Sequence, residues 1–140
     1  MTSIIETSAS APQAAVGSAP RAWMNRITWG LRILLALAFA AAAVPKLLGA
    51  EAMVQIFQAI GFGQWFRLVT GLVELTGAAL LLVPGVAFLG GLLLAATMAC
   101  AILTHLVLIG GSPAAAVVLF ALSTFVAWRL KPRPHGTFAG

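Results

Sequence analysis

Among the charged or titratable side chains within or beside the apolar segments, four could do chemistry together, namely Lys46, Arg67, Glu74 and His105. A charge at the centre of a membrane helix costs about 2.5–3.5 kcal/mol on insertion scales, so each residue needs a partner or a function. Glu74 is the most informative, because it lies ~13 Å from either end of its segment by helix rise. We expect its carboxylate to pair with a cation or to hold a proton. The structural alternative is a helix–helix hydrogen bond made by a neutral carboxyl.

The cations that could pair with Glu74 lie at different heights in the membrane. Arg67 precedes it by about two helical turns and faces nearly the same way. Lys46 lies near the outer end of the preceding segment, about 10 Å from Glu74 along the membrane normal, as counted from the helix rise. The aliphatic part of the lysine side chain closes some of this gap, and water or a ligand could bridge the rest. The alternative is that Lys46 snorkels to the membrane interface. Arg32, in the inner half of the first segment, is expected to snorkel to the cytoplasmic headgroups.

His105 lies near the outer end of the third apolar segment. An imidazole at that depth carries protons, donates a hydrogen bond to a quinone or carbonyl oxygen, or has a structural role only. Cys100 is about 140° away around the helix, so the two form no dyad and we expect Cys100 to be a small packing residue. With one cysteine and two histidines, the chain predicts no intramolecular disulfide and no metal or haem site of its own.

Membrane helices must position these residues, because the composition excludes a soluble domain. Of the 140 residues, 61% are hydrophobic and 8% charged, whereas soluble proteins carry about 25% charged residues. The mean hydropathy is +1.06. The net charge of +5 reflects a shortage of acids. Basic residues lie at the ends of apolar runs and not in a patch interleaved with aromatics, which argues against a nucleic-acid partner and for the lipid bilayer.

Four apolar segments predict membrane-spanning helices. They run over about residues 27–48, 65–83, 86–109 and 114–130. Each is close to the ~20 residues that a helix needs to cross ~30 Å of hydrocarbon, and none alternates as a barrel strand does. The connections after the second and third segments are so short that these helices must form antiparallel hairpins. The sequence therefore predicts an all-α integral membrane protein built as a four-helix transmembrane bundle.

A short interfacial helix is expected between the first two spans. Met53, Ile56, Phe57 and Ile60 follow the i, i+3, i+4, i+7 spacing of one helix face. Such an amphipathic segment typically lies in the plane of the membrane interface. An irregular loop is the alternative.

The remaining segments are predicted to be tails. Residues 1–22 are rich in Ala, Ser and Pro and are expected to be a disordered tail, 23–131 the membrane domain, and 132–140 a short cytoplasmic tail. The sequence leaves open whether Met1 or Met24 is the start. The positive-inside rule places both termini in the cytoplasm. It rests on the basic residues that flank the first and fourth spans, namely Arg21, Arg26, Arg129, Lys131 and Arg133.

The order of these features resembles the DoxX-like family of small four-helix bacterial membrane proteins, over about residues 27–130. The resemblance rests on Lys46-Leu47, on Phe57-Gln58-Ala59-Ile60-Gly61, on Gly71-Leu72-Val73-Glu74-Leu75-Thr76-Gly77-Ala78 and on Thr104-His105-Leu106. Its most specific part is Gly-x-x-Glu-Leu-x-Gly-Ala with the upstream Lys-Leu. Pro45 departs from the family pattern, in which a small residue, often Gly, precedes the lysine.

The resemblance implies a four-helix bundle in the bacterial inner membrane. The wider DoxX group includes the small membrane subunit of a thiosulfate:quinone oxidoreductase and members linked to membrane-associated responses to oxidative stress. Most DoxX-like members have no established activity, so the resemblance predicts the fold more strongly than it predicts the function.

Our leading hypothesis is a membrane subunit of a redox system in contact with the quinone pool. Lys46, Arg67 and His105 would bind a quinone or anionic head group, and Glu74 would handle its proton. The chain encodes no electron carrier, so as an oxidoreductase subunit it needs a redox partner protein and is not a complete enzyme alone. The alternatives are a non-catalytic membrane anchor or assembly partner, and a small transporter or channel that acts as a homo-oligomer.

Overall fold

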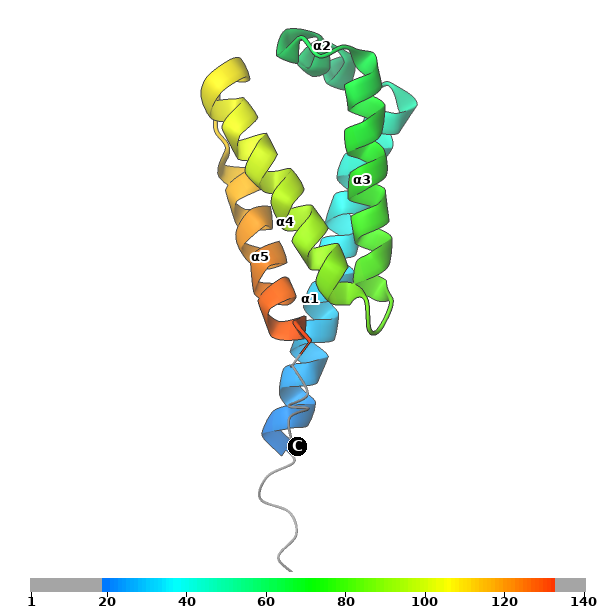
Figure 1. The fold of residues 1–140 in the computed structure, drawn as a ribbon, viewed down its shortest axis with the longest axis vertical. Coiled ribbons are helices and arrows are strands. Elements are labelled where there is room, and N and C mark those ends of the chain that lie inside the picture. Colours follow the sequence, from blue (N-terminus) through cyan, green and yellow to red (C-terminus); the bar gives the residue numbers. More distant parts are fainter. Residues whose placement is uncertain (1–18, 133–140) are drawn as a thin grey trace, which may run out of the picture.

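The computed structural model describes residues 19–132 of the chain, and these residues form helices and no strand (Figure 1). In chain order the elements are α1 (Ala19–Leu48), α2 (Glu51–Ile60), α3 (Gln64–Leu82), α4 (Ala87–Thr104), the π-helical turn η1 (His105–Ile109) and α5 (Ala114–Leu130). The predicted all-α bundle is confirmed, including the short helix between the first two long ones.

The helices have the length and apolar character of membrane spans. Among the described residues, three stretches are long and apolar enough to cross a bilayer, namely Ala22–Leu48, Gln64–Leu82 and Ala87–Ile109. The fourth expected span is the apolar helix α5, which has 17 residues and so a length of only ~26 Å. Large apolar side chains such as Leu37, Leu72 and Val118 are exposed on the outside of the bundle, where lipid would contact them. The protein is therefore a helical membrane protein.

Two boundaries differ from the expected ones. α1 begins at Ala19, so residues 19–22, which were expected to belong to a disordered tail, are helical. The third span is not a regular α-helix throughout, because its last five residues form the π-helical turn η1. The rest of the predicted N-terminal tail, 1–18, and the end of the chain, 133–140, lie outside the described residues.

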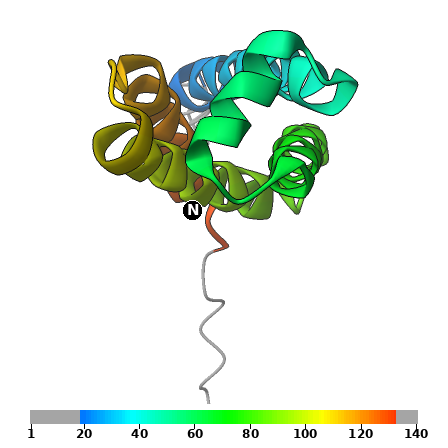
Figure 2. The ribbon, with the colours of Figure 1, turned by 90° about the horizontal axis from the view of Figure 1, so that it is seen from above.

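The long helices form two antiparallel pairs, α1 with α3 and α4 with α5. The pairs meet where α3 contacts α4, near the turn at Pro84-Gly85, and they diverge toward the opposite end (Figure 1). The short helix α2 lies across that wider end and contacts α1, α3 and η1 (Figure 2). The bundle is thus closed at one end by direct helix contact and at the other by α2.

Glycines explain why the bundle is tightest near the Pro84-Gly85 turn. A Cβ atom on Gly90 of α4 would lie 2.8 Å from the Gly77 carbonyl oxygen and 2.7 Å from the Leu81 amide nitrogen, so only glycine permits this approach to α3. Gly91 approaches α5 in the same way, since its Cβ would lie 3.1 Å from the Ser123 carbonyl oxygen. Small residues allow membrane helices to pack backbone against backbone. The space inside the bundle therefore lies at the other end, under α2.

Candidate functional site

Lys46 and Glu74 form a buried ion pair between α1 and α3. The Lys46 Nζ lies 2.7 Å from Oε2 and 2.9 Å from Oε1 of Glu74, and the two side chains are 16% and 3% exposed. A third hydrogen bond from Nζ reaches the Ala42 carbonyl at 3.3 Å. The lysine therefore turns into the bundle instead of snorkelling to the interface, and of the two states expected for Glu74 the structure shows the one paired with a cation.

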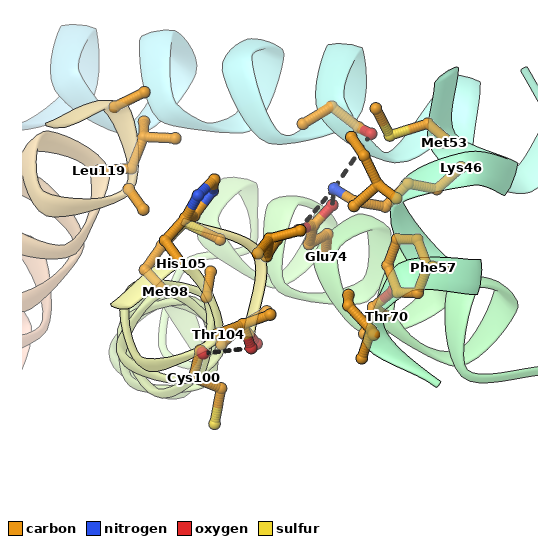
Figure 3. Close-up of a pocket in the computed structure, with 18 of the residues that line it drawn as sticks. Lys46, Met53, Phe57, Thr70, Glu74, Met98, Cys100, Thr104, His105 and Leu119 are labelled. Carbon is orange, nitrogen blue, oxygen red and sulfur yellow. Dashed lines mark hydrogen bonds and ion pairs between the residues drawn. The ribbon is translucent and has the colours of Figure 1, made fainter. Parts of the chain in front are cut away.

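The ion pair lies on the wall of a cavity of about 320 Å³, within the range of ~300–1,000 Å³ that is common for ligand sites. Every described helix contributes to this wall, and so does η1. Most of the lining is apolar, and the titratable side chains with polar groups near the cavity are Lys46, Glu74 and His105 (Figure 3). Three of the four candidate site residues thus surround one cavity.

The apolar face of α2 covers this cavity. The cavity lining includes all four residues whose spacing predicted the helix, namely Met53, Ile56, Phe57 and Ile60. The apolar face of the predicted short helix is therefore turned toward the cavity. The Gln64 side chain holds α2 in place with a 3.0 Å hydrogen bond to the Val54 carbonyl.

His105 is the first residue of η1 and is half-buried in the cavity wall. Its Nδ1 lies 3.2 Å from the carbonyl oxygen of Gly110. A carbonyl can only accept, so this contact assigns the proton to Nδ1 and leaves Nε2 of the neutral ring as an acceptor. In Figure 3 the ring extends toward the cavity, on the opposite side of its helix from the Cys100 sulfur.

Cys100 is exposed, and its thiol points away from Glu74 and His105 (Figure 3). Cys100 was expected to be a small packing residue, and this was wrong, since its exposed side chain faces outward from α4. The expected absence of a Cys100–His105 dyad agrees with this geometry. Three threonines also line the cavity, but each hydroxyl donates a 2.9 Å hydrogen bond to a carbonyl of its own helix, as in Thr70, Thr97 and Thr104.

Arg67 is not part of the cavity wall. Its Nη1 donates to the main-chain carbonyl of Lys46, and its Nε donates to Oε1 of Gln64 at 2.8 Å. The guanidinium therefore caps the C-terminal end of α1, where carbonyl groups lack intrahelical partners and a positive charge is favourable. Arg67 does share the buried face of α3 with Glu74, as its spacing predicted, but it lies closer to the end of the helix.

Arg32 has the equivalent position at the other end of the α1–α3 pair. It is 5% exposed, its Nε donates to the Leu81 carbonyl at 2.6 Å, and its guanidinium carbon lies 3.9 Å from the centre of the Trp29 ring. The expectation that Arg32 snorkels to the headgroups was wrong, because the last turn of α3 provides a carbonyl within reach. No local pattern could indicate this contact, because it depends on how α1 and α3 are rotated against each other.

Among residues 19–132 there is no group of three or more His, Cys, Asp or Glu side chains that could bind a metal ion.

In the comparison with known proteins, the family model for the DoxX-like family aligns with residues 30–128. No curated protein and no solved structure matches the chain. The aligned range contains α3 and α4 in full, and with them the ion pair and His105. The resemblance expected over about residues 27–130 is confirmed.

Proposed function

The chain belongs to the DoxX-like family of membrane proteins, and on this basis we propose that it is a membrane subunit of a redox system that binds a quinone. The observation that carries the proposal is the apolar cavity with the Lys46–Glu74 ion pair and His105 on its wall. Such a combination of apolar surface and few polar groups is typical of sites for small, largely apolar molecules.

The dimensions and lining of the cavity suit a single quinone ring. A volume of about 320 Å³ is near the lower end of the range for ligand sites, so the cavity holds a ring with small substituents, and a longer chain would extend beyond it. Phe57 of α2 and Met98 of α4 offer apolar surface to the ring faces. The polar groups on the wall then lie near the oxygens at the ring edge.

The polar side chains can take part in proton transfer. Interconversion of a quinone and its hydroquinone moves two electrons and two protons. Glu74 and His105 are side chains that exchange protons, while Lys46 compensates the charge of the Glu74 carboxylate. The electrons would pass to or from a partner redox protein, because the sequence carries no motif for an electron carrier of its own.

We also propose an orientation in the bacterial inner membrane. The basic residues Arg26, Arg129 and Lys131 belong to the end of the bundle where α1 begins and α5 ends. An excess of Lys and Arg marks the cytoplasmic side. In this orientation α2 and the cavity lie in the outer half of the membrane, and both termini lie in the cytoplasm.

Native mass spectrometry on the protein, gently extracted from its own membrane, tests the quinone proposal. The comparison is with the double variant Lys46→Met, Glu74→Gln, which removes the ion pair without leaving one buried charge alone. We expect a quinone-sized mass on the wild type and its loss from the double variant. Thr97→Val serves as the control, because it changes a cavity-lining hydroxyl that bonds only to its own helix.

The same experiment can contradict the proposal. A bound partner protein with no small molecule, unchanged in the double variant, would favour a non-catalytic anchor or assembly partner instead. An oligomer of the chain alone, again without a small molecule, would favour the transporter or channel.

A further inference from the structure

The hydrogen bonds of the Lys46 ammonium restrict what the cavity can offer a ligand. An ammonium group has three N–H donors and no acceptor. The Lys46 Nζ has three acceptors within reach, the two carboxylate oxygens of Glu74 at 2.7 and 2.9 Å and the Ala42 carbonyl at 3.3 Å. Its donors are therefore engaged within the protein. Lys46 fixes the position of Glu74 but has no donor to spare for a ligand oxygen.

The donors of the other polar side chains that line the cavity are also engaged within the protein. The Nδ1–H of His105 is directed to the Gly110 carbonyl, and the hydroxyls of the three lining threonines are directed to carbonyls of α3 and α4. The acceptor atoms of these side chains, by contrast, are in part unpaired. The Nε2 of His105 and the further lone pairs of the Glu74 carboxylate have no donor among the described residues. The side chains in this cavity thus present acceptors.

We infer that the cavity binds the hydroquinone form of its ligand in preference to the quinone form. This inference rests on the proposed function and adds the redox state that the site selects. The two oxygens of a quinone only accept hydrogen bonds, so they would meet the acceptors of Glu74 and His105 without a proton between them. A hydroquinone carries an O–H on each oxygen and can donate to both. A ligand that covers the acceptors of Glu74 and His105 without donating to them loses binding free energy, whereas a ligand that donates to them gains it.

The preference has a consequence for redox chemistry. Tighter binding of the reduced form stabilises that form, so the midpoint potential of the bound couple rises relative to the free couple. For a two-electron couple, a tenfold preference corresponds to a rise of about 30 mV. The site would therefore hold the ring in its reduced state, with Glu74 and His105 positioned to accept the protons when the ring is oxidised by a partner redox protein.

Three probes that share one ring test the inference. They are trimethylhydroquinone, trimethyl-1,4-benzoquinone and the dimethyl ether of trimethylhydroquinone, each titrated anaerobically against the wild-type protein in lipid nanodiscs. The ether keeps the ring and its two oxygens but has no O–H donor. We expect the hydroquinone to bind at least about tenfold more tightly than either of the others, because each acceptor that the ring covers without pairing weakens binding by about this factor.

One variant tests whether His105 is an acceptor for the hydroquinone, and a second variant serves as its control. His105→Phe removes Nε2 and should lower hydroquinone affinity about tenfold, with quinone affinity little changed. Thr97→Val should leave the ratio of the two affinities as it is in the wild type. If the quinone binds as tightly as the hydroquinone to the wild type, the inference fails while the proposed function stands. If none of the three probes binds, the proposed function fails, and the inference with it.

Discussion

The guanidinium of Arg67, near the start of α3, donates a hydrogen bond to the main-chain carbonyl of Lys46, near the end of α1. At the other end of the same pair, Arg32 of α1 donates to the carbonyl of Leu81 in α3. Each helix thus supplies a cation to the C-terminal carbonyls of the other, which lack intrahelical partners and carry partial negative charge. This reciprocal arrangement fixes the relative height of α1 and α3 and so brings Lys46 level with Glu74.

Removing the inner arginine should therefore weaken the bundle. Arg32→Met loses the hydrogen bond to Leu81 and the contact with the Trp29 ring. We expect the free energy of unfolding to fall by about 1–3 kcal/mol, measured by denaturant titration in detergent micelles. Arg26→Met is the matched control on the same helix, because Arg26 is exposed and its replacement should change stability by less than about 0.5 kcal/mol. Equal effects of the two substitutions would contradict the structural role of Arg32.

The sequence predicted the helices well, because hydropathy and spacing depend on local residues alone. The apolar face of α2 could be predicted from Met53, Ile56, Phe57 and Ile60. The depth of Glu74 predicted either a cation partner or a bound proton, and the structure shows the cation, Lys46. The burial of Arg67 and Glu74 on one face of α3 also followed from their spacing. These features need only the period of a helix and the cost of a charge in lipid.

What the sequence could not predict depends on how helices are rotated and how they end. Arg32 was expected at the headgroups but is buried, and Cys100 was expected to be a small packing residue but is exposed. Their true positions depend on which face each helix presents to its neighbours. The π-helical turn at His105 was also missed, since no residue in it is a specific sign of that geometry. His105, the first residue of this turn, contacts the carbonyl of Gly110 just beyond its end.

The Lys46–Glu74 ion pair should behave as a unit. Glu74→Gln alone leaves the Lys46 charge inside the bundle without its partner, and we expect the free energy of unfolding to fall by about 3–5 kcal/mol. Lys46→Met alone should have a similar effect, because it leaves the negative charge of Glu74 inside the bundle without its partner. The double variant should regain most of the lost stability, because no uncompensated charge remains. Strictly additive effects of the two single substitutions would contradict a direct interaction between the residues.

Gly90 should tolerate no side chain at the crossing of α3 and α4. A Cβ at this position would lie 2.7–2.8 Å from backbone atoms of α3, which cannot yield without moving the helix. Gly90→Ala should therefore lower the free energy of unfolding by about 1–3 kcal/mol. Gly30→Ala on α1 is the control, since nothing lies within 4 Å of its Cβ. There alanine should be neutral, or stabilising by about 0.5–1 kcal/mol. Comparable losses in both variants would show that the crossing is less close than the structure has it.

Cysteine labelling should reveal which side of the membrane the cavity faces. Ser112 lies in the turn between η1 and α5, at the same end as α2, and we propose that this end faces outward. In a Cys100→Ser background, a membrane-impermeant maleimide added to whole cells with a permeabilised outer membrane should label Ser112→Cys. The same reagent should not label a cysteine that replaces Lys131, beyond the end of α5, until the inner membrane is opened. The reverse labelling pattern would place Ser112 in the cytoplasm and overturn the orientation that the basic residues predict.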